Sequence, residues 1–255
     1  MQLILTFIIL SIITLTAVLL IVLSKNSRSG KVRQIAQNHN WQYEEFIDFS
    51  DTIKQANFGI LNYSQNAVFR HLISADDEHF GLGFISFDCR ALEPSGIHNS
   101  SIILFNLKLT SEFNNLHYSI NRPHLDKDAF SDISKQQSNR NQLRQQKLIA
   151  LASHQVPSAF LELADNDIEF DSYANDPALA HRFFQAICSS PENKSSLIHW
   201  FLAHPHLHIE ISNGMLLAYQ KNHLIEDTSI LDAIYIVKEL AQIFSYKKIG
   251  QTSFD

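Results

Sequence analysis

Apolar positions follow two different patterns along this chain. In the first pattern, Leu3–Leu23 forms one unbroken run, in which 16 of 21 residues are Leu, Ile, Val or Phe and none is charged. A helix of that length rises about 30 Å, the thickness of the hydrocarbon core of a bilayer. We therefore predict that residues 1–24 form a transmembrane anchor. In the second pattern, which covers the rest of the chain, apolar residues recur at the spacings of strands and helices.

A basic flank follows the apolar run directly, whereas only two uncharged residues precede it. The flank contains Lys25, Arg28, Lys31 and Arg33. Because Lys and Arg beside a membrane span tend to stay on the cytoplasmic side, we expect the N-terminus outside and the remaining residues in the cytoplasm. The same charges would meet anionic headgroups, at about 1 kcal/mol per residue. This flank, residues 25–40, also carries a short predicted helix that ends near Asn40.

Two other arrangements of the N-terminal run stay open. A cleaved signal peptide would need a basic start, an apolar core of about 7–15 residues and a small-residue cleavage site. This run starts without charge, is longer, and has no Ala-x-Ala motif near Ser24. A reversed anchor would place the domain in the periplasm. The two cysteines, Cys89 and Cys188, are far apart in sequence and fit reduced, packed thiols, which agrees with a cytoplasmic domain.

Residues 41–255 are predicted to form one domain that starts with strands. Trp41–Phe46 is expected to be extended, and a hairpin and two further strands follow it. These strands are 68–73, 80–87, 101–109 and 117–120. Residues 121–145 are almost entirely polar, and we interpret them as an exposed insertion that becomes helical over 142–153. Strand-like alternation then resumes at 160–163 and 167–170.

The last third of the domain is predicted to hold helices and one clear hairpin. Asp176-Pro177 is a helix start, because Asp can cap the first turn and Pro is tolerated there. The predicted helices cover 177–188, 195–202 and 228–246, and Thr228 is expected to cap the last one. Asn213-Gly214 joins two alternating runs, which predicts a type I′ hairpin over 207–220. The expected fold class is therefore α+β, with a mainly antiparallel β-sheet packed by helices.

Charge and composition argue against several functions. Without the four flanking basic residues the chain has 16 basic against 26 acidic residues, a net charge of −10 with His neutral. Such an acidic body does not attract nucleic acid. We also expect no cofactor: the chain has only seven Gly, and Gly81-Leu82-Gly83 leads along a strand, not into a phosphate-binding helix. The chain contains no Gly-x-Ser-x-Gly nucleophile motif.

One pattern resembles a metal site, the alternating series His204, His206, His208 and Glu210. Alternate residues of a strand share one face, and imidazole with carboxylate suits zinc or iron. His206, His208 and Glu210 are therefore the candidate ligands. Pro205 interrupts the series, however, and residues in one row along a strand spread too far to surround one ion. The competing interpretation is a polar, partly exposed sheet face, opposite Met215, Leu217 and Tyr219.

Several motifs occur in a fixed order after the anchor and its basic flank. They are Trp41-x-Tyr43, Phe84–Asp88, Tyr173–Pro177, Ser190-Pro191 and His208–Tyr219. In this layout the chain resembles a family of uncharacterised bacterial proteins with a single-pass membrane anchor and one domain of unknown function. The resemblance spans most of the chain except the polar stretch near 121–145. Its motifs are structural, so it implies no site residues.

The expected function follows from the anchor and from the lack of a catalytic motif. We expect a non-enzymatic binding or accessory module, tethered at the cytoplasmic face of the bacterial inner membrane, that binds another protein or a lipid headgroup. The alternative is a metal-dependent hydrolase that uses the His204–His208 cluster. Elemental analysis of the purified protein distinguishes these two hypotheses.

Overall fold

The computed structural model describes residues 14–16, 27–62, 67–76, 81–93, 96–121, 148–150 and 171–245. Within these residues, no helix is both long enough and apolar enough to cross a bilayer. Of the predicted anchor only Thr14–Thr16 is described, as a helical turn with Leu15 exposed. The rest of Leu3–Leu23 lies outside the described residues, so the transmembrane helix stays a prediction.

Helix α2 (Arg28–Asn38) opens the body of the protein, and only four residues separate it from Leu23. It begins where Ser27 is extended and accepts a hydrogen bond from a first-turn amide, as serine N-caps do. Val32 and Ala36 are its buried residues. The short helix predicted for the basic flank is confirmed. Strand β1 (Gln42–Phe46) follows it, also as predicted.

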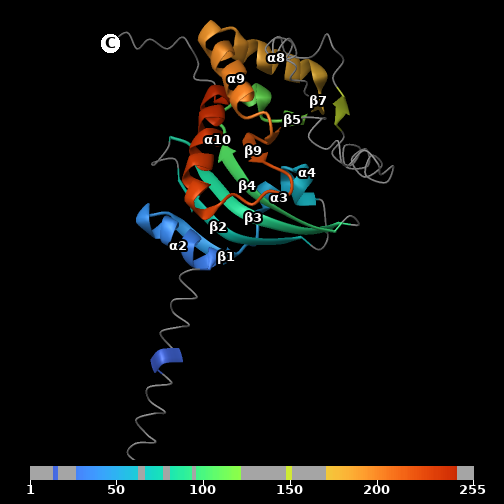
Figure 1. Ribbon diagram of the computed structural model, residues 1–255. Helices are drawn as coiled ribbons and strands as arrows, with labels where there is room; N and C mark the ends of the chain where they lie inside the picture. The colour runs from blue at the N-terminus through green and yellow to red at the C-terminus, as the bar shows by residue number, and fades with distance from the viewer. Residues whose placement is uncertain are drawn as a thin grey trace, which may run out of the picture.

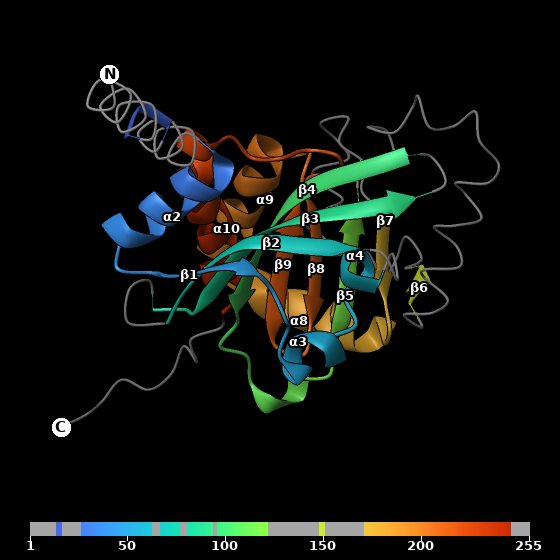
Figure 2. The ribbon, with the colours of Figure 1, turned by 90° about the horizontal axis from the view of Figure 1, so that it is seen from below.

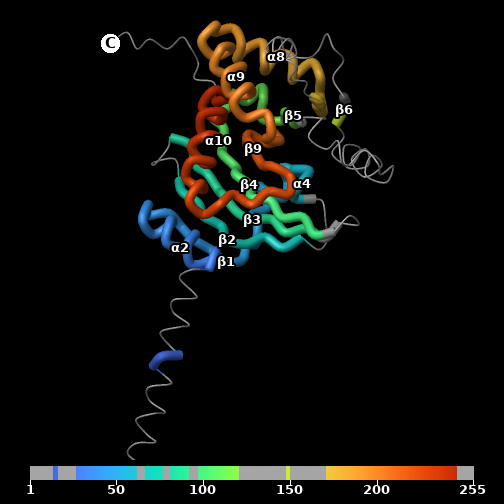
Figure 3. The backbone as a smooth tube through the Cα atoms, in the orientation of Figure 1, coloured from blue at the N-terminus to red at the C-terminus, as the bar shows by residue number. Residues whose placement is uncertain are grey.

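The described strands form one nine-stranded sheet in the order β1-β2-β3-β4-β9-β8-β5-β7-β6. All neighbouring strands are antiparallel, which confirms the α+β class with a mainly antiparallel sheet. After β1 the strands are β2 (Val68–Ala75), β3 (Phe84–Glu93), β4 (Gly96–Asn106), β5 (His117–Asn121), β6 (Ile149–Ala150), β7 (Asp171–Ala174), β8 (His208–Ser212) and β9 (Met215–Tyr219). Strands β4 and β9 are far apart in sequence but lie side by side in the middle of the sheet (Figure 3).

The hairpin of β8 and β9 has the predicted turn and register. Asn213 and Gly214 have φ angles of 48° and 70°, and both are positive, as a type I′ turn requires. The register places the expected cross-strand neighbours opposite one another: His208 and Tyr219, Glu210 and Leu217, Ser212 and Met215.

Four of the described helices pack on one face of the sheet (Figures 1 and 2). They are α2, α8 (Pro177–Cys188), α9 (Pro191–Ala203) and α10 (Ile230–Phe244). The predicted apolar stripe of α10 is buried, and Asp176 caps α8 through hydrogen bonds from two first-turn amides, as predicted. The prediction that Thr228 caps α10 is wrong, because Asp227–Ser229 forms a separate 3₁₀ turn and the helix begins after it.

Two short helices, α3 (Asp51–Gln55) and α4 (Gly59–Asn62), contribute to the core on the other face of the sheet. Phe58 lies between them and is fully buried, in the same core cluster as Leu217 of β9. Helices α3 and α4 were not predicted from the sequence, because one turn of helix is too short to show a helical period.

The polar middle of the chain differs from its prediction where it is described. Residues 142–153 were expected to be helical, but Ile149–Ala150 pairs with β7 as the edge strand β6. The free edge of β7 offers backbone hydrogen bonds that outweigh the local helical preference. Apart from Asn121, the insertion at 121–145 lies outside the described residues. The same holds for the strands expected at 160–163 and 167–170.

Candidate functional site

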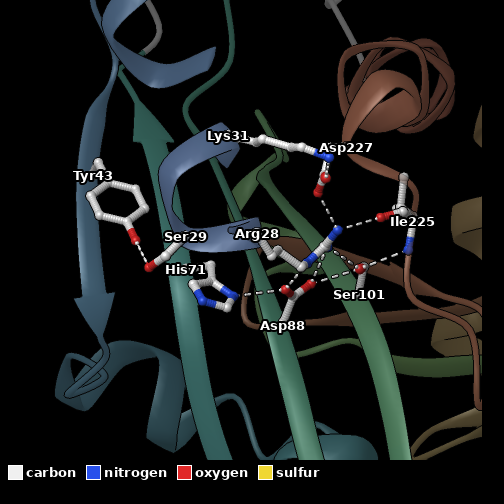
Figure 4. A network of polar contacts seen from close by, with 9 residues as sticks. All are labelled: Arg28, Ser29, Lys31, Tyr43, His71, Asp88, Ser101, Ile225 and Asp227. Carbon is white, nitrogen blue, oxygen red and sulfur yellow. Dashed lines mark hydrogen bonds and ion pairs between the residues drawn. The ribbon is translucent and has the colours of Figure 1, made fainter. Parts of the chain in front are cut away.

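Charged and polar side chains from five segments meet on the α2 side of strands β2, β3 and β4 (Figure 4). We call this group the Arg28 cluster; it consists of Arg28, Lys31, His71, Asp88, Ser101 and Asp227. Arg28 and Lys31 come from the first turn of α2, and Asp227 lies directly before α10. The cluster therefore joins the beginning of the body to its last helix.

Arg28 lies at the centre of the cluster. Its Nε and Nη2 donate to the two carboxylate oxygens of Asp88 at 2.6 and 2.8 Å, a bidentate ion pair. Its Nη1 donates to Asp227 at 2.8 Å and to the carbonyl of Ile225 at 2.7 Å, and Nη2 also reaches Ser101 at 3.3 Å. These contacts use all five N–H groups of the guanidinium. Burial alone would lower the pKa of Arg28, but Asp88 and Asp227 outweigh it and raise that pKa above its ordinary value.

The carboxylate of Asp88 likewise forms all its hydrogen bonds within the cluster. Besides the two bonds from Arg28, it accepts one from the Ser101 hydroxyl at 2.7 Å and one from Nδ1 of His71 at 3.0 Å. Burial by itself raises the pKa of a carboxyl group. Here the hydrogen bonds from Arg28, His71 and Ser101, with the charge of Arg28, outweigh burial and lower the pKa of Asp88 to about 2. Asp88 is therefore ionised at physiological pH.

A β-bulge brings His71 to Asp88. The register of β2 against β3 shifts between Arg70 and Ile73, so that β2 carries one extra residue opposite Phe87. His71 has a φ of 56°, in the left-handed region, which costs a residue other than Gly about 1–2 kcal/mol. Bulges beside functional sites often redirect a side chain, and here the redirected imidazole donates to Asp88.

The segment before α10 closes the cluster. Lys31 forms an ion pair with Asp227 at 3.0 Å, and the amide of Ile225 donates to the Ser101 hydroxyl at 3.0 Å. The two basic side chains of the cluster match the two carboxylates in number. Arg28 and Lys31 are thus paired with carboxylates of the body, and the expectation that they also meet lipid headgroups stays a prediction.

The contacts of the Arg28 cluster indicate a structural role, not a catalytic one. The cavity beside it measures about 10 Å³, close to the least space that one water molecule needs. A reaction site must leave hydrogen-bonding groups open to a substrate, whereas the guanidinium of Arg28 and the carboxylate of Asp88 use theirs within the protein. The cluster therefore holds α2 against the sheet and the α10 segment.

The predicted metal ligands do not come together. The ring of His208 stacks on Tyr219 with 5.1 Å between centroids, whereas His206 lies in the turn before β8, with its ring 6.4 Å from that of His204. Burial, with the charge of His223, lowers the pKa of His206. In the part of the chain that the structure describes, no three His, Cys, Asp or Glu side chains are arranged to hold a metal ion.

Glu210, the third predicted ligand, faces a histidine of the neighbouring strand. It is only 4% exposed and accepts a hydrogen bond from the amide of Gly59 at 2.8 Å. Its Oε2 lies 3.9 Å from Nε2 of His117, beyond hydrogen-bonding distance. Among the described residues, Nε2 of His117 has no hydrogen-bond partner. The expectation of a partly exposed face is wrong at Glu210, because the start of α4 packs against it.

Asp88 and His71 are site residues that were not predicted from the sequence. A signal for Asp88 was present, because it is a charge within an apolar strand, and a buried carboxylate needs a cationic partner. The basic residues of the flank are such partners. His71 had no comparable signal, since its position depends on how β2 registers against β3.

Comparisons of the chain with protein-family models, with curated proteins and with solved structures give no match. The resemblance to a family of anchored bacterial proteins stays a prediction.

Proposed function

We propose that this protein is a membrane-tethered, non-enzymatic binding or accessory module at the cytoplasmic face of a bacterial membrane. The main support for the proposal is the short connection between the predicted anchor and helix α2. Only four residues separate the apolar run from α2, and the Arg28 cluster fastens α2 to the sheet. A body attached in this way stays at the membrane surface instead of moving on a long linker.

The basic flank supports a cytoplasmic location of the domain. Lys25, Arg28, Lys31 and Arg33 all follow the apolar run, and charge asymmetry of this kind sets the orientation of an anchor. The later pairing of Arg28 and Lys31 with carboxylates of the body does not remove this effect, because orientation is set during insertion.

The form of the Arg28 cluster supports a structural role for it and not a catalytic one. The guanidinium of Arg28 and the carboxylate of Asp88 form their hydrogen bonds within the protein. The cavity beside the cluster has room for about one water molecule. The rival hypothesis of a metal-dependent hydrolase draws no support from the described residues, because His206, His208 and Glu210 point to different surroundings.

Membrane extraction tests the tether. The full chain should stay in the membrane pellet after alkaline carbonate treatment. Ile13→Arg places a charge at the centre of the apolar run, which costs about 2.5–3.5 kcal/mol, and should increase the fraction of the protein that carbonate extracts. Ile13→Leu is the matched control and should behave as wild type. A wild-type chain that carbonate extracts would overturn the proposal.

Reporter fusions test on which side of the membrane the domain lies, and affinity capture tests whether the protein is a binding module. A fluorescent protein fused after Asp255 should fluoresce, and alkaline phosphatase at the same position should be inactive, because phosphatase folds only after export. Active phosphatase would place the domain in the periplasm. Capture of the solubilised full chain after crosslinking should return a reproducible protein partner or a preferred lipid, and finding neither would count against a binding module.

A further inference from the structure

The short connection keeps one end of the body close to the lipid. This inference rests on the proposed function, namely on Leu3–Leu23 being the anchor. The four residues between Leu23 and α2 can span at most about 14 Å when fully extended. The first turn of α2, and every segment fastened to it, must therefore lie near the membrane surface.

Two segments are fastened to that turn. The chain that leads into α10 is tied to Arg28 through the carbonyl of Ile225 at 2.7 Å. The beginning of β4 is tied to the same chain, because the amide of Ser101 donates to the carbonyl of His223 at 2.9 Å, and His98 is hydrogen-bonded to Asn222. Both segments consequently lie near the membrane surface, as α2 does.

Each of these segments exposes an aliphatic side chain. Leu224 is 38% exposed and Ile97 is 53% exposed. Leu224 directly precedes Ile225, and Ile97 lies four residues before Ser101 on β4, where side chains of even spacing share a face. By that spacing Ile97 lies on the same face of β4 as Ser101 of the cluster, and Leu224 lies in the segment whose next residue, Ile225, is bonded to Arg28.

The local charge also favours lipid at this end. In the cluster the charges of Arg28 and Lys31 balance those of Asp88 and Asp227, whereas the rest of the body beyond the flank has 16 basic against 24 acidic residues, a net charge of −8 with His neutral. An acidic body is repelled by an anionic membrane, and the repulsion is smallest where its charges are compensated. The compensated end is the one that bears the two exposed aliphatic side chains.

We propose that Ile97 and Leu224 form a second contact of the body with the bilayer, inserting at the headgroup boundary beside the anchor. The partner of this surface is the lipid itself. The contact fixes the orientation of the domain: the cluster faces the membrane, and helices α8 and α9, which lie at the end of the molecule opposite α2 (Figure 1), face away from it.

Site-specific fluorescence of the full chain in lipid vesicles tests the contact. Cys188 is replaced by Ser, the buried Cys89 is kept, and single cysteines are introduced as Ile97→Cys or Leu224→Cys. Each is labelled with a polarity-sensitive dye, and the vesicles contain lipids with a quencher at headgroup depth. Leu202→Cys is the matched control, because Leu202 of α9 is 37% exposed and lies on the distal helix.

The labels at 97 and 224 should emit at shorter wavelength and lose most of their emission to the quencher, whereas the label at 202 should emit as in water. If all three labels emit as in water while carbonate leaves the protein in the vesicles, the anchor stands and the second contact is refuted. If carbonate extracts the protein, the proposed function fails and this inference with it. Equal quenching at 202 would refute the proposed orientation.

Discussion

Asp88→Asn should destabilise the body by about 2 kcal/mol at pH 7. The interactions of Asp88 lower its pKa from 3.8 to about 2, and each pH unit of that difference is worth about 1.4 kcal/mol. Asn keeps the size of the side chain but removes the charge that compensates Arg28. For a chain of this length, each kcal/mol corresponds to about 2–4 °C in Tm, so thermal unfolding of the detergent-solubilised protein should show a decrease of about 4–8 °C.

The pH dependence separates this mechanism from a simple packing defect. A carboxyl group with a lowered pKa stabilises the fold above its ordinary pKa, and this contribution is lost as the pH falls through the folded-state pKa. The difference in Tm between wild type and Asp88→Asn should therefore be constant above about pH 5 and should shrink progressively between about pH 5 and pH 1.

An exposed control variant and a double variant complete the test of Asp88→Asn. Asp48→Asn is the control, because Asp48 also pairs with a basic residue, Lys54, but its side chain is almost fully exposed; it should cost less than about 0.5 kcal/mol. The double variant Arg28→Gln with Asp88→Asn should lose less stability than the two single variants added together. A Tm for Asp88→Asn within a degree of wild type, or a difference that does not change with pH, would refute the reasoning.

Three further substitutions or labels examine other features. His71→Ala should be about 1 kcal/mol less stable than His71→Gly in urea unfolding, because both lose the bond to Asp88 but only Gly adopts a φ of 56° without strain; equal midpoints would contradict the bulge geometry. Glu210→Ala should cost about 2–3 kcal/mol and Glu210→Gln clearly less, since Gln still offers an oxygen to the buried amide of Gly59; the reverse order in the same assay would contradict this. Cys188, which is half-buried, should react with a thiol reagent in the native protein and the buried Cys89 only after unfolding; simultaneous reaction would contradict the described core.

Much of the fold could be predicted, because it depends on local periodicity. The Asn213-Gly214 turn, the apolar stripe of α10 and the cap at Asp176 are each determined by a few neighbouring residues, and all three are confirmed. The predictions that failed lie where the chain depends on distant partners. The strand at Ile149–Ala150 forms only because the edge of β7 is present.

The site could be predicted only in part, for the same reason. Arg28 and Lys31 were noticed as charges, but their partners Asp88 and Asp227 are reached only through the tertiary fold. The alternation behind the metal hypothesis holds only for His208 and Glu210, because β8 begins at His208. It could not show that Glu210 would be covered by the start of α4.

The position of Asp227 has a consequence for biosynthesis. Arg28 and Asp227 are 199 residues apart in the chain, and strand β9 occupies the middle of the sheet, between β4 and β8. At about 5–20 residues per second, a ribosome that has just produced Arg28 needs roughly 10–40 s more to deliver the last contact of that arginine. The nascent domain therefore stays with an incomplete sheet during that time, and it becomes compact only when synthesis is nearly finished.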